Sequence, residues 1–466
     1  MSLFALVISA PFATAQEGIV GDWYGVLDVQ GVMKLRIVFH IEKTDAGYNT
    51  TLDSPDQGAY GLKVSKTTFS QPTLTLEMPD LMATFTGEAD GDFTEIKGIF
   101  EQGGLKMPLT MDRQASEQPA ISRPQEPKPP FPYYEEEVFF ENIEAGVTLA
   151  GTLTLPTKDG KYPVVVLVSG SGPQDRNEEL LGHKPFLVLA DHLTRQGIGV
   201  LRYDDRGVGG STGQHSLATS EDFAADALAA VTYLKSRPGV NTKQIGIIGH
   251  SEGGIIAPMC AAESDDVAFI VLLAGTGTDG EEVLLTQINL INIANGYTQE
   301  QNEAELKTFS KALHLIKTER DTANLRLALT EMFVQYFEQM PEEERQKFGS
   351  PDYFVKSQVN PLSSPWFRFF IRHDPKTVLE KVKCPVLALN GEKDLQVEPK
   401  ANLAGIEAAL KKSGNTNFTI KELPGLNHLF QTSETGAPSE YSQIEETFSP
   451  KALKVISDWI LKITGH

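Results

Sequence analysis

The sequence predicts an α/β fold in which helices cover both faces of a mostly parallel sheet, with an inserted helical segment and a small all-β domain in front. Three observations predict it. Short alternating strands fill residues 18–113, a proline-rich stretch covers 114–132, and from residue 133 apolar strands alternate with helices. Such alternation typically gives a parallel sheet that is buried on both faces.

The composition is that of a globular protein with more than one domain. The 466 residues are 40% hydrophobic and 22% charged, which suits two or three cores. A formal net charge of −21 argues against nucleic acid and anionic membranes as partners. We expect Cys260 and Cys384, both in apolar segments, to be free thiols, and we expect no metal or cofactor. The oligomeric state stays open, a homo-oligomer included.

The N-terminal sequence predicts export from a bacterial cell. Residues 1–15 contain a short apolar run, and Ala13-Thr14-Ala15 precedes Gln16 as in the A-x-A cleavage site of a signal peptide. The run is too short to span a bilayer, and no later stretch is long and apolar enough to do so. We therefore expect a periplasmic or extracellular protein.

Residues 18–113 have the pattern of antiparallel strands. Apolar and polar residues alternate along 34–41 and 73–78, and glycine and aspartate turns separate such runs. This spacing favours a small barrel or sandwich, and the G-D-W at 21–23 resembles the G-x-W of lipocalin-like barrels. The simplest interpretation is an accessory domain, and the alternative is a domain that binds a ligand or presents substrate.

Prolines recur among polar residues in 114–132, which favours an extended linker. The following segments alternate between apolar strands and amphipathic helices. We expect strands at 138–140, 147–155, 163–168, 199–203, 244–248, 268–273, 384–389 and 418–422, and helices at 185–196, 220–236 with Ser220 as N-cap, 255–262, and 450–463 with Ser449 as N-cap.

The alternation stops between about 279 and 376, where Glu, Gln, Lys, Leu and Ala recur at helical spacing. Helices inserted into a sheet domain most simply form a cap. Trp366, Phe367, Phe369 and Phe370 gather near the end of this segment. They either pack in a core or line an apolar substrate pocket under the cap.

The segment 245–254, I-G-I-I-G-H-S-E-G-G, predicts a nucleophilic serine. An apolar strand ends at Gly249, an apolar helix starts near Ile255, and Ser251 lies between them in G-x-S-x-G. A sharp turn raises the serine oxygen above the sheet edge, and the start of the helix offers N–H groups to an oxyanion. The alternative, a glycine-rich turn with a capping serine, is less consistent with a strand before and a helix after.

A serine nucleophile needs a base, and the base needs a carboxylate. Asp394 follows an apolar strand, at the sheet edge where an acid would be carried, while its competitor Glu392 should face solvent in the middle of the turn. His428 follows strand 418–422. The order Ser, Asp, His along the chain matches that of α/β-hydrolases.

The remaining histidines of the 9 in the chain fit the role of base less well, because they lie in helices, in connecting segments, in the β domain or at the terminus. His250 is next to the serine in sequence. We expect its side chain to leave the elbow in another direction.

The segment 169–176, S-G-S-G-P-Q-D-R, leaves an earlier strand and is the candidate oxyanion loop. In this fold one oxyanion N–H comes from that loop and the other from the residue after the nucleophile. These residues are Ser171 and Glu252. Asp175 and Arg176 are expected to hold the loop in shape by ion pairing.

Taken together, these motifs resemble the serine aminopeptidase-like (S33/S9-like) group of the α/β-hydrolase superfamily. The plan of a small β domain followed by a capped hydrolase resembles bacterial EstD-type carboxylesterases. The resemblance implies an α/β-hydrolase fold, although many relatives have His-Gly where this chain has Ser169-Gly170. It rests on S-G-S-G-P-Q-D-R at 169–176, Y-D-D-R-G at 203–207, which we expect to support the site, G-H-S-E-G-G at 249–254, G-E-K-D at 391–394 and N-H at 427–428.

The sequence therefore predicts a serine hydrolase, most simply a carboxylesterase for short-chain acyl esters. Ser251 would attack the ester, His428 would take its proton, Asp394 would orient His428, and the N–H groups of Ser171 and Glu252 would hold the oxyanion. An aminopeptidase or oligopeptidase is the second choice, since acidic cap residues could bind a substrate amine. A non-catalytic binding protein is a remote third, because it would be expected to lack one of the three residues. A serine at the elbow argues against epoxide hydrolase or dehalogenase chemistry.

Overall fold

The computed structural model describes residues 18–29, 33–45, 47–57, 59–81, 83–102, 105–114, 122–342, 345 and 350–465. The predicted signal peptide at 1–15 lies outside these residues, as do residues 115–121 of the predicted linker. No described helix is long and apolar enough to cross a membrane.

The chain forms two compact units. One consists of residues 1–120 and 333–358, and the other of residues 121–332 and 359–466. The boundary at 120 falls within the predicted linker. Residues 333–358, which the sequence assigned to the inserted helical segment, belong to the same unit as the N-terminal strands.

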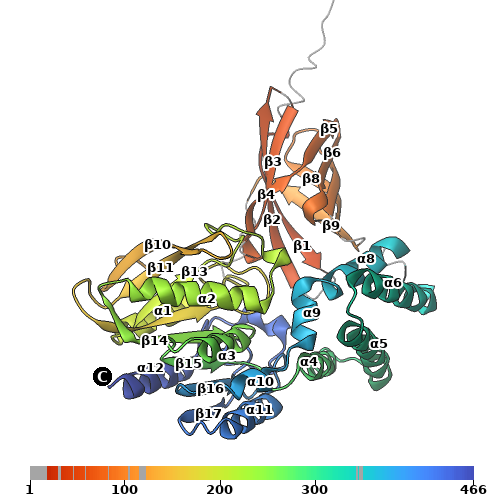
Figure 1. The fold of residues 1–466 in the computed structure, drawn as a ribbon. Coiled ribbons are helices and arrows are strands. Elements are labelled where there is room, and N and C mark those ends of the chain that lie inside the picture. The colour runs from red at the N-terminus through yellow and green to blue at the C-terminus, as the bar shows by residue number, and fades with distance from the viewer. Residues whose placement is uncertain are drawn as a thin grey trace, which may run out of the picture. The chain divides into compact units, whose positions relative to one another are not determined.

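The N-terminal strands form a single antiparallel sheet of 9 strands in the order β4-β3-β2-β1-β9-β8-β7-β6-β5, drawn in red and orange in Figure 1. Alternate side chains fill one core around Trp23, Phe39 and Phe85, as the period of two predicted. Thr67 of β5 donates a hydrogen bond to Thr50 of β3 at 2.8 Å, so the sheet curls until strands near its two edges meet. The strands are β1 Gly21–Val29, β2 Met33–Thr44, β3 Gly47–Ser54, β4 Ala59–Val64, β5 Lys66–Ser70, β6 Thr73–Met78, β7 Ala83–Ala89, β8 Glu95–Gln102 and β9 Leu105–Asp112.

The second unit contains an 8-stranded sheet in the order β10-β11-β13-β12-β14-β15-β16-β17. The two N-terminal strands are antiparallel, and all pairs from β13 to β17 are parallel. This confirms the predicted mostly parallel sheet. The strands are β10 Tyr134–Asn142, β11 Val147–Leu155, β12 Tyr162–Val168, β13 Gly199–Tyr203, β14 Val240–His250, β15 Phe269–Leu273, β16 Val386–Gly391 and β17 Phe418–Leu423.

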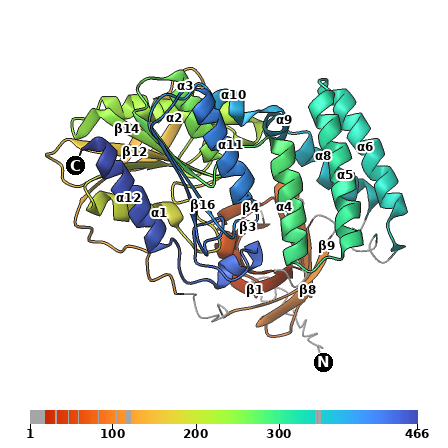
Figure 2. The ribbon, with the colours of Figure 1, turned by 90° about the horizontal axis from the view of Figure 1, so that it is seen from below.

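Helices cover both faces of this sheet. Figure 2 shows α1 and α12 on one side and α2 and α3 on the other, and each side has its own apolar core. The N-cap of α2 is Thr219 rather than the expected Ser220, because Thr219 is still extended and Asp222 accepts hydrogen bonds from its N–H and hydroxyl groups at 2.8 and 3.0 Å. The helices are α1 Pro185–Arg195, α2 Ser220–Lys235, α3 Gly253–Glu263, α11 Pro399–Lys412 and α12 Pro450–Thr464.

A helical segment separates β15 from β16, where the sequence predicted helices. Within the second unit, α4 packs against α5, and α9 packs against both. The helices of this segment are α4 Gly280–Ala294, α5 Gln299–Thr318, α6 Thr322–Gln339, α8 Pro351–Leu362, α9 Pro365–Arg372 and α10 Pro375–Leu379.

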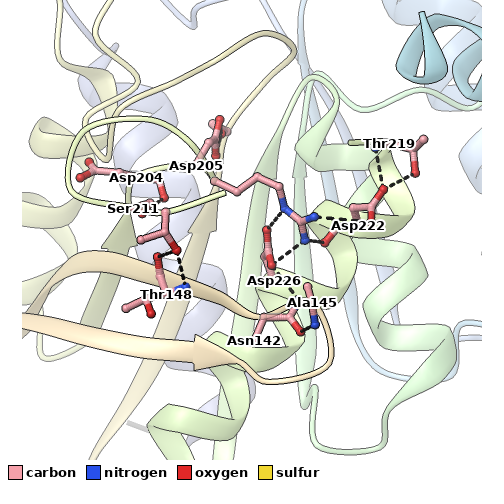
Figure 3. Close-up of polar contacts among 12 residues, drawn as sticks. Asn142, Ala145, Thr148, Asp204, Asp205, Ser211, Thr219, Asp222 and Asp226 are labelled. Atoms are coloured by element: carbon pink, nitrogen blue, oxygen red, sulfur yellow. Dashed lines mark hydrogen bonds and ion pairs between the residues drawn. The ribbon is translucent and has the colours of Figure 1, made fainter. Parts of the chain in front are cut away.

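The turn after β13 is fixed by a buried ion pair. Arg206 donates to both carboxylate oxygens of Asp226 in α2, at 2.7 and 2.8 Å, and Asn142 of β10 donates to the same carboxylate at 2.8 Å (Figure 3). Asp226 is 1% exposed. Removing one partner of such a pair leaves an uncompensated charge inside the protein.

We expect Asp226→Asn to lower the free energy of unfolding of this unit by about 3–5 kcal/mol, because the buried Arg206 guanidinium would lose the carboxylate that accepts two of its hydrogen bonds and would be left with the longer ion pair with Asp222 at 3.5 Å. Urea denaturation measures the change. The control is Asp266→Asn, which breaks the half-exposed pair with Lys235 and should cost less than about 1 kcal/mol. Equal effects of the two substitutions would contradict the account.

Candidate active site

The sharp turn predicted around the serine is present. β14 ends at His250 and α3 begins at Gly253, and Ser251 between them has a φ of 51°. A left-handed backbone is strained for a residue with a side chain. The N–H of Ser251 donates to the carbonyl of Leu273 in β15 at 2.8 Å, so the sheet itself holds this conformation.

Glycines at both sides of the serine make the turn feasible. A Cβ on Gly249 would lie 1.9 Å from the carbonyl oxygen of Gly253, and a Cβ on Gly253 would lie 2.2 Å from the carbonyl oxygen of Val168. No side chain fits at such distances. The start of α3 is therefore pressed directly against the ends of β14 and β12.

Asp394 and His428 come together at the carboxyl edge of the sheet. His428 Nδ1 lies 2.8 Å from Asp394 Oδ2, and the N–H groups of Gln396 and Val397 donate to Asp394 Oδ1 at 2.8 and 2.9 Å. Both residues are buried: His428 is 4% exposed and Asp394 is 1% exposed. Glu392 is exposed, as expected. The carboxylate thus fixes the orientation of the ring through Nδ1 and leaves Nε2 without a contact to it.

The loop that carries His428 is shaped by its neighbour Asn427. This side chain is fully buried, and its oxygen accepts from the N–H groups of Leu429 and Gln431 at 3.0 and 2.9 Å. A Cβ on Gly391 would lie 2.2 Å from the carbonyl oxygen of Leu426. The loops of Asp394 and His428 are therefore packed on each other.

The ring of His250 lies against that of His428, with 4.9 Å between the ring centroids. Its Nε2 donates to the backbone oxygen of His428 at 3.0 Å, and its Nδ1 lies 2.8 Å from Glu178 Oε1. The sequence predicts that His250 leaves the elbow in a direction other than that of Ser251, and its ring binds the buried carboxylate of Glu178 and the His428 loop. Among hydrogen bonds of the described residues, none joins Ser251 directly to His428.

Two aspartates in the turn after β13, Asp204 and Asp205, hold the loop 169–176. Ser169 donates to Asp205 at 3.0 Å, and burial raises the pKa of that carboxyl well above its ordinary value. Arg176 donates from its Nη2 to Asp204 Oδ2 at 2.8 Å and also pairs with Glu137. The Y-D-D-R-G segment thus supports the loop.

Of the two residues expected to hold this loop by ion pairing, Arg176 forms ion pairs, with Asp204 and Glu137, whereas Asp175 acts through backbone groups. Asp175 accepts from the N–H groups of Asn177 and Glu179 at 3.1 and 2.9 Å. The two neighbouring residues thus bind different parts of the structure.

The two predicted oxyanion donors both line the pocket that contains Ser251. Within the described part of the chain, the N–H groups of Ser171 and Glu252 donate no hydrogen bond. Both are therefore available to an oxygen in the pocket.

This pocket is partly open to solvent, and the empty space in it, including its open side, is about 470 Å³. Trp366 and Phe370 form one wall, with their rings stacked 5.5 Å apart, whereas Phe367 and Phe369 are outside the lining and Phe369 stacks on His373. Residues four apart share one helix face, which explains the division. The lining is Ser171, Ser251, Glu252, Ile255, Thr276, Val283, Leu284, Gln287, Trp366, Phe370, Gln396 and Val397.

Glu252 is the ionisable residue of this lining. Its Oε1 accepts from Ser220 Oγ at 2.6 Å and from Trp366 Nε1 at 2.7 Å. Burial raises the pKa of Glu252. Glu252, the residue directly after Ser251, thus holds the indole ring of Trp366 in the pocket wall.

Sequence reasoning missed Glu178, the role of the Glu252 side chain, and the three lining residues of α4. No motif marks any of them. The positive φ of Glu178, 52°, is a signal that only the structure gives.

The two cysteines do not offer an alternative nucleophile. Cys260 and Cys384 are free thiols, and burial raises the pKa of Cys260 and raises that of Cys384 to about 12. Thiols at such pKa values are inert. In the described residues, no group of His, Cys, Asp and Glu side chains is arranged to hold a metal ion.

Known proteins resemble this chain in sequence. Esterase EstD of Thermotoga maritima is 28% identical over 370 residues, which cover 78% of this chain and 78% of that protein. The putative hydrolase YtaP of Bacillus subtilis is 33% identical over 132 residues, 24% of this chain and 43% of that protein.

Solved structures also align with it. The α/β-hydrolase GrgF of Penicillium matches with a TM-score of 0.43 at 18% identity, over 71% of this chain and 98% of that one. An esterase of Pyrococcus furiosus matches with a TM-score of 0.42 at 16% identity, over 74% of this chain and 97% of that one.

A family model described as X-Pro dipeptidyl-peptidase (S15 family) matches residues 145–415. The match includes Ser251 and Asp394. The α/β-hydrolase expectation is confirmed, and S15 is the family matched within that superfamily. Because this match spans more than half of the sequence, the chain belongs to the S15 (X-Pro dipeptidyl-peptidase) family of α/β-hydrolases.

Proposed function

We propose that this serine hydrolase is a carboxylesterase that cleaves short-chain acyl esters through an acyl-enzyme. The observation that carries the proposal is the buried hydrogen bond of 2.8 Å between His428 and Asp394 at the sheet edge that carries the strained Ser251. This combination of strained serine, imidazole and carboxylate suits acyl transfer.

In the proposed reaction, Ser251 Oγ attacks the ester carbonyl carbon while His428 Nε2 takes its proton. The N–H groups of Ser171 and Glu252 donate to the oxyanion. Collapse of the tetrahedral intermediate breaks the bond to the alcohol, which leaves with the proton from His428. Water then attacks the acyl group with His428 again as base, and the acid and free Ser251 are released.

The pocket favours an ester over a peptide substrate. A dipeptidyl-peptidase, the activity in the family's description, must bind the ammonium group at the substrate N-terminus. Glu252 is the acid of the pocket lining, but it already accepts two hydrogen bonds, and burial raises its pKa. Since burial disfavours its charge, it is a poor partner for an ammonium ion. EstD, the similar protein from Thermotoga maritima, is an esterase by name.

The lining also supports an apolar, uncharged acyl group. Ile255, Val283, Leu284, Trp366 and Phe370 provide an apolar surface. The lining contains no Lys, Arg or His, so an acyl group with its own carboxylate would be buried without a counter-charge.

The helical segment between β15 and β16 acts as a cap in this proposal. Its helices α4 and α9 contribute Val283, Leu284, Gln287, Trp366 and Phe370 to the lining. Substrate selection would therefore depend on the inserted helices, while the sheet carries the chemistry.

Export is a separate part of the proposal and rests on Ala13-Thr14-Ala15. Cell fractionation with N-terminal sequencing tests it. A mature protein that begins at Gln16 outside the cytoplasm supports export, and an intact Met1 in the cytoplasm contradicts it.

The proposal predicts that the protein cleaves p-nitrophenyl acetate and butyrate with a kcat/KM at least about 100-fold above that for Gly-Pro-p-nitroanilide, since the pocket lacks a site for an ammonium ion. Ser251→Ala should lower kcat by about 10⁶. The control is Ser236→Ala, an exposed serine, which should keep full activity. Preference for the anilide would reverse the choice between esterase and peptidase.

We also expect Phe370→Ala to shift the acyl-length preference toward longer chains, because the cavity it leaves can hold added methylenes. The ratio of kcat/KM between p-nitrophenyl octanoate and butyrate should rise roughly 10–200-fold, as for about one methylene-sized contact. Phe369→Ala is the matched control, since this ring lies next to the wall but outside the lining. The pocket assignment is wrong if both variants shift the ratio equally.

A further inference from the structure

A second buried histidine lies beside the proposed catalytic one and has no part in the proposed steps. His250 precedes Ser251 and is 7% exposed, and its partner Glu178 is 6% exposed. The Nδ1 of His250 lies 2.8 Å from Glu178 Oε1, and its Nε2 lies 3.0 Å from the backbone oxygen of His428.

The same carboxylate reaches the oxyanion loop. The N–H of Gly170, the residue before Ser171, donates to Glu178 Oε1 at 2.7 Å. A Cβ on Gly170 would lie 3.3 Å from both Glu178 Oε1 and Ser251 Cβ, so this loop rests directly on the pair. His250 and Glu178 therefore contact the three loops that carry the nucleophile, the base and one oxyanion donor.

Both ring nitrogens of His250 face acceptors. A backbone carbonyl can only accept, so Nε2 carries hydrogen. Glu178 Oε1 already accepts from Gly170, and a hydrogen on Nδ1 satisfies the contact with it. A ring protonated at both nitrogens matches this geometry.

The electrostatics agree with the geometry. Burial opposes charge on the ring, but Glu178, the carbonyl of His428 and the nearby Asp394 together raise the pKa of His250. His183 provides a contrast, since it is also buried but its hydrogen-bond partners among the described residues are the neutral groups of Thr447 and Gln431 and the carbonyl of Tyr441. The nearby charge of Arg123 further disfavours the protonation of His183. Burial lowers the pKa of His183 to about 4.

We propose that His250 and Glu178 form a charged positioning pair, which holds the oxyanion loop and the backbone of His428 in register with Ser251. The inference rests on the proposed function. A displacement of about 1 Å in reacting groups can cost about 100-fold in rate. Loss of the pair should therefore lower kcat and leave substrate binding largely unchanged.

The first test is Glu178→Gln, which keeps the shape and an acceptor for Gly170 but removes the charge. We expect kcat for p-nitrophenyl acetate to fall about 10–100-fold, with KM within about twofold of the parent. Glu392→Gln is the matched control, because Glu392 also accepts a backbone N–H, that of Gly425, but from an exposed position. It should leave kcat unchanged. A parent-like kcat in folded Glu178→Gln would overturn the proposal.

A double-mutant cycle tests whether the two residues act together. If they form one unit, Glu178→Gln combined with His250→Gln should be no slower than the slower single variant. Losses that multiply would show two independent roles and overturn the pair.

The labelling rate of Ser251 by a fluorophosphonate separates this inference from the proposed function. If the parent protein is labelled but cleaves no ester, the esterase proposal fails, while the pair is still judged by whether Glu178→Gln slows labelling about 10–100-fold.

Nitrogen NMR of ¹⁵N-histidine-labelled protein tests the pair without any substitution in the measured sample. His250, assigned by the loss of its signals in His250→Gln, should keep hydrogen on both nitrogens to a higher pH than an exposed histidine does. His183 should be neutral throughout that range. A singly protonated His250 ring at pH 6 would overturn the proposal even if Glu178→Gln fails to fold.

Discussion

The close approach of α3 to the ends of β12 and β14 is the constraint on which the site depends. Gly249 and Gly253 permit it, since a Cβ at either position would collide with backbone. The chain must then pass from strand to helix within two residues, and Ser251 takes a φ of 51°. The same turn leaves the N–H of Glu252 at the start of a helix, where an oxyanion would be stabilised. The proposed nucleophile and one of the proposed oxyanion donors are therefore both consequences of one packing contact.

Buried acids hold the surrounding loops in register with this turn, each through a distinct set of donors. Asp394 binds His428 and two backbone N–H groups, Asp205 binds the hydroxyl of Ser169, and Glu178 binds Gly170 and His250. Because a buried polar or charged group without hydrogen-bond partners is costly, each acid favours a single loop arrangement. This rigidity suits acyl transfer, in which reacting groups must stay within a fraction of an ångström.

The sequence was informative where chemistry follows directly from local structure. Asp394 and His428 each follow an apolar strand, and parallel strands bring such loops to one edge, so their meeting could be predicted. Glu178 could not, because its contact with His250 depends on how a loop without periodicity folds back. Which aromatic side chains line the pocket could not be predicted either, because it depends on which face of α9 is turned toward the pocket. Trp366 and Phe370 lie on that face, and Phe369 does not. The membership of 333–358 in the N-terminal unit depends on long-range packing that no local pattern encodes.

The central claim is that the elbow places Ser251 between an imidazole base and two backbone donors. A crystal structure of the covalent adduct with a p-nitrophenyl alkylphosphonate tests it most directly, because the phosphoryl oxygen imitates the oxyanion. The account predicts phosphorus bonded to Ser251 Oγ, with the phosphoryl oxygen about 2.7–3.1 Å from the N–H nitrogens of Ser171 and Glu252. An adduct on another residue, or a phosphoryl oxygen turned away from both N–H groups, would contradict it.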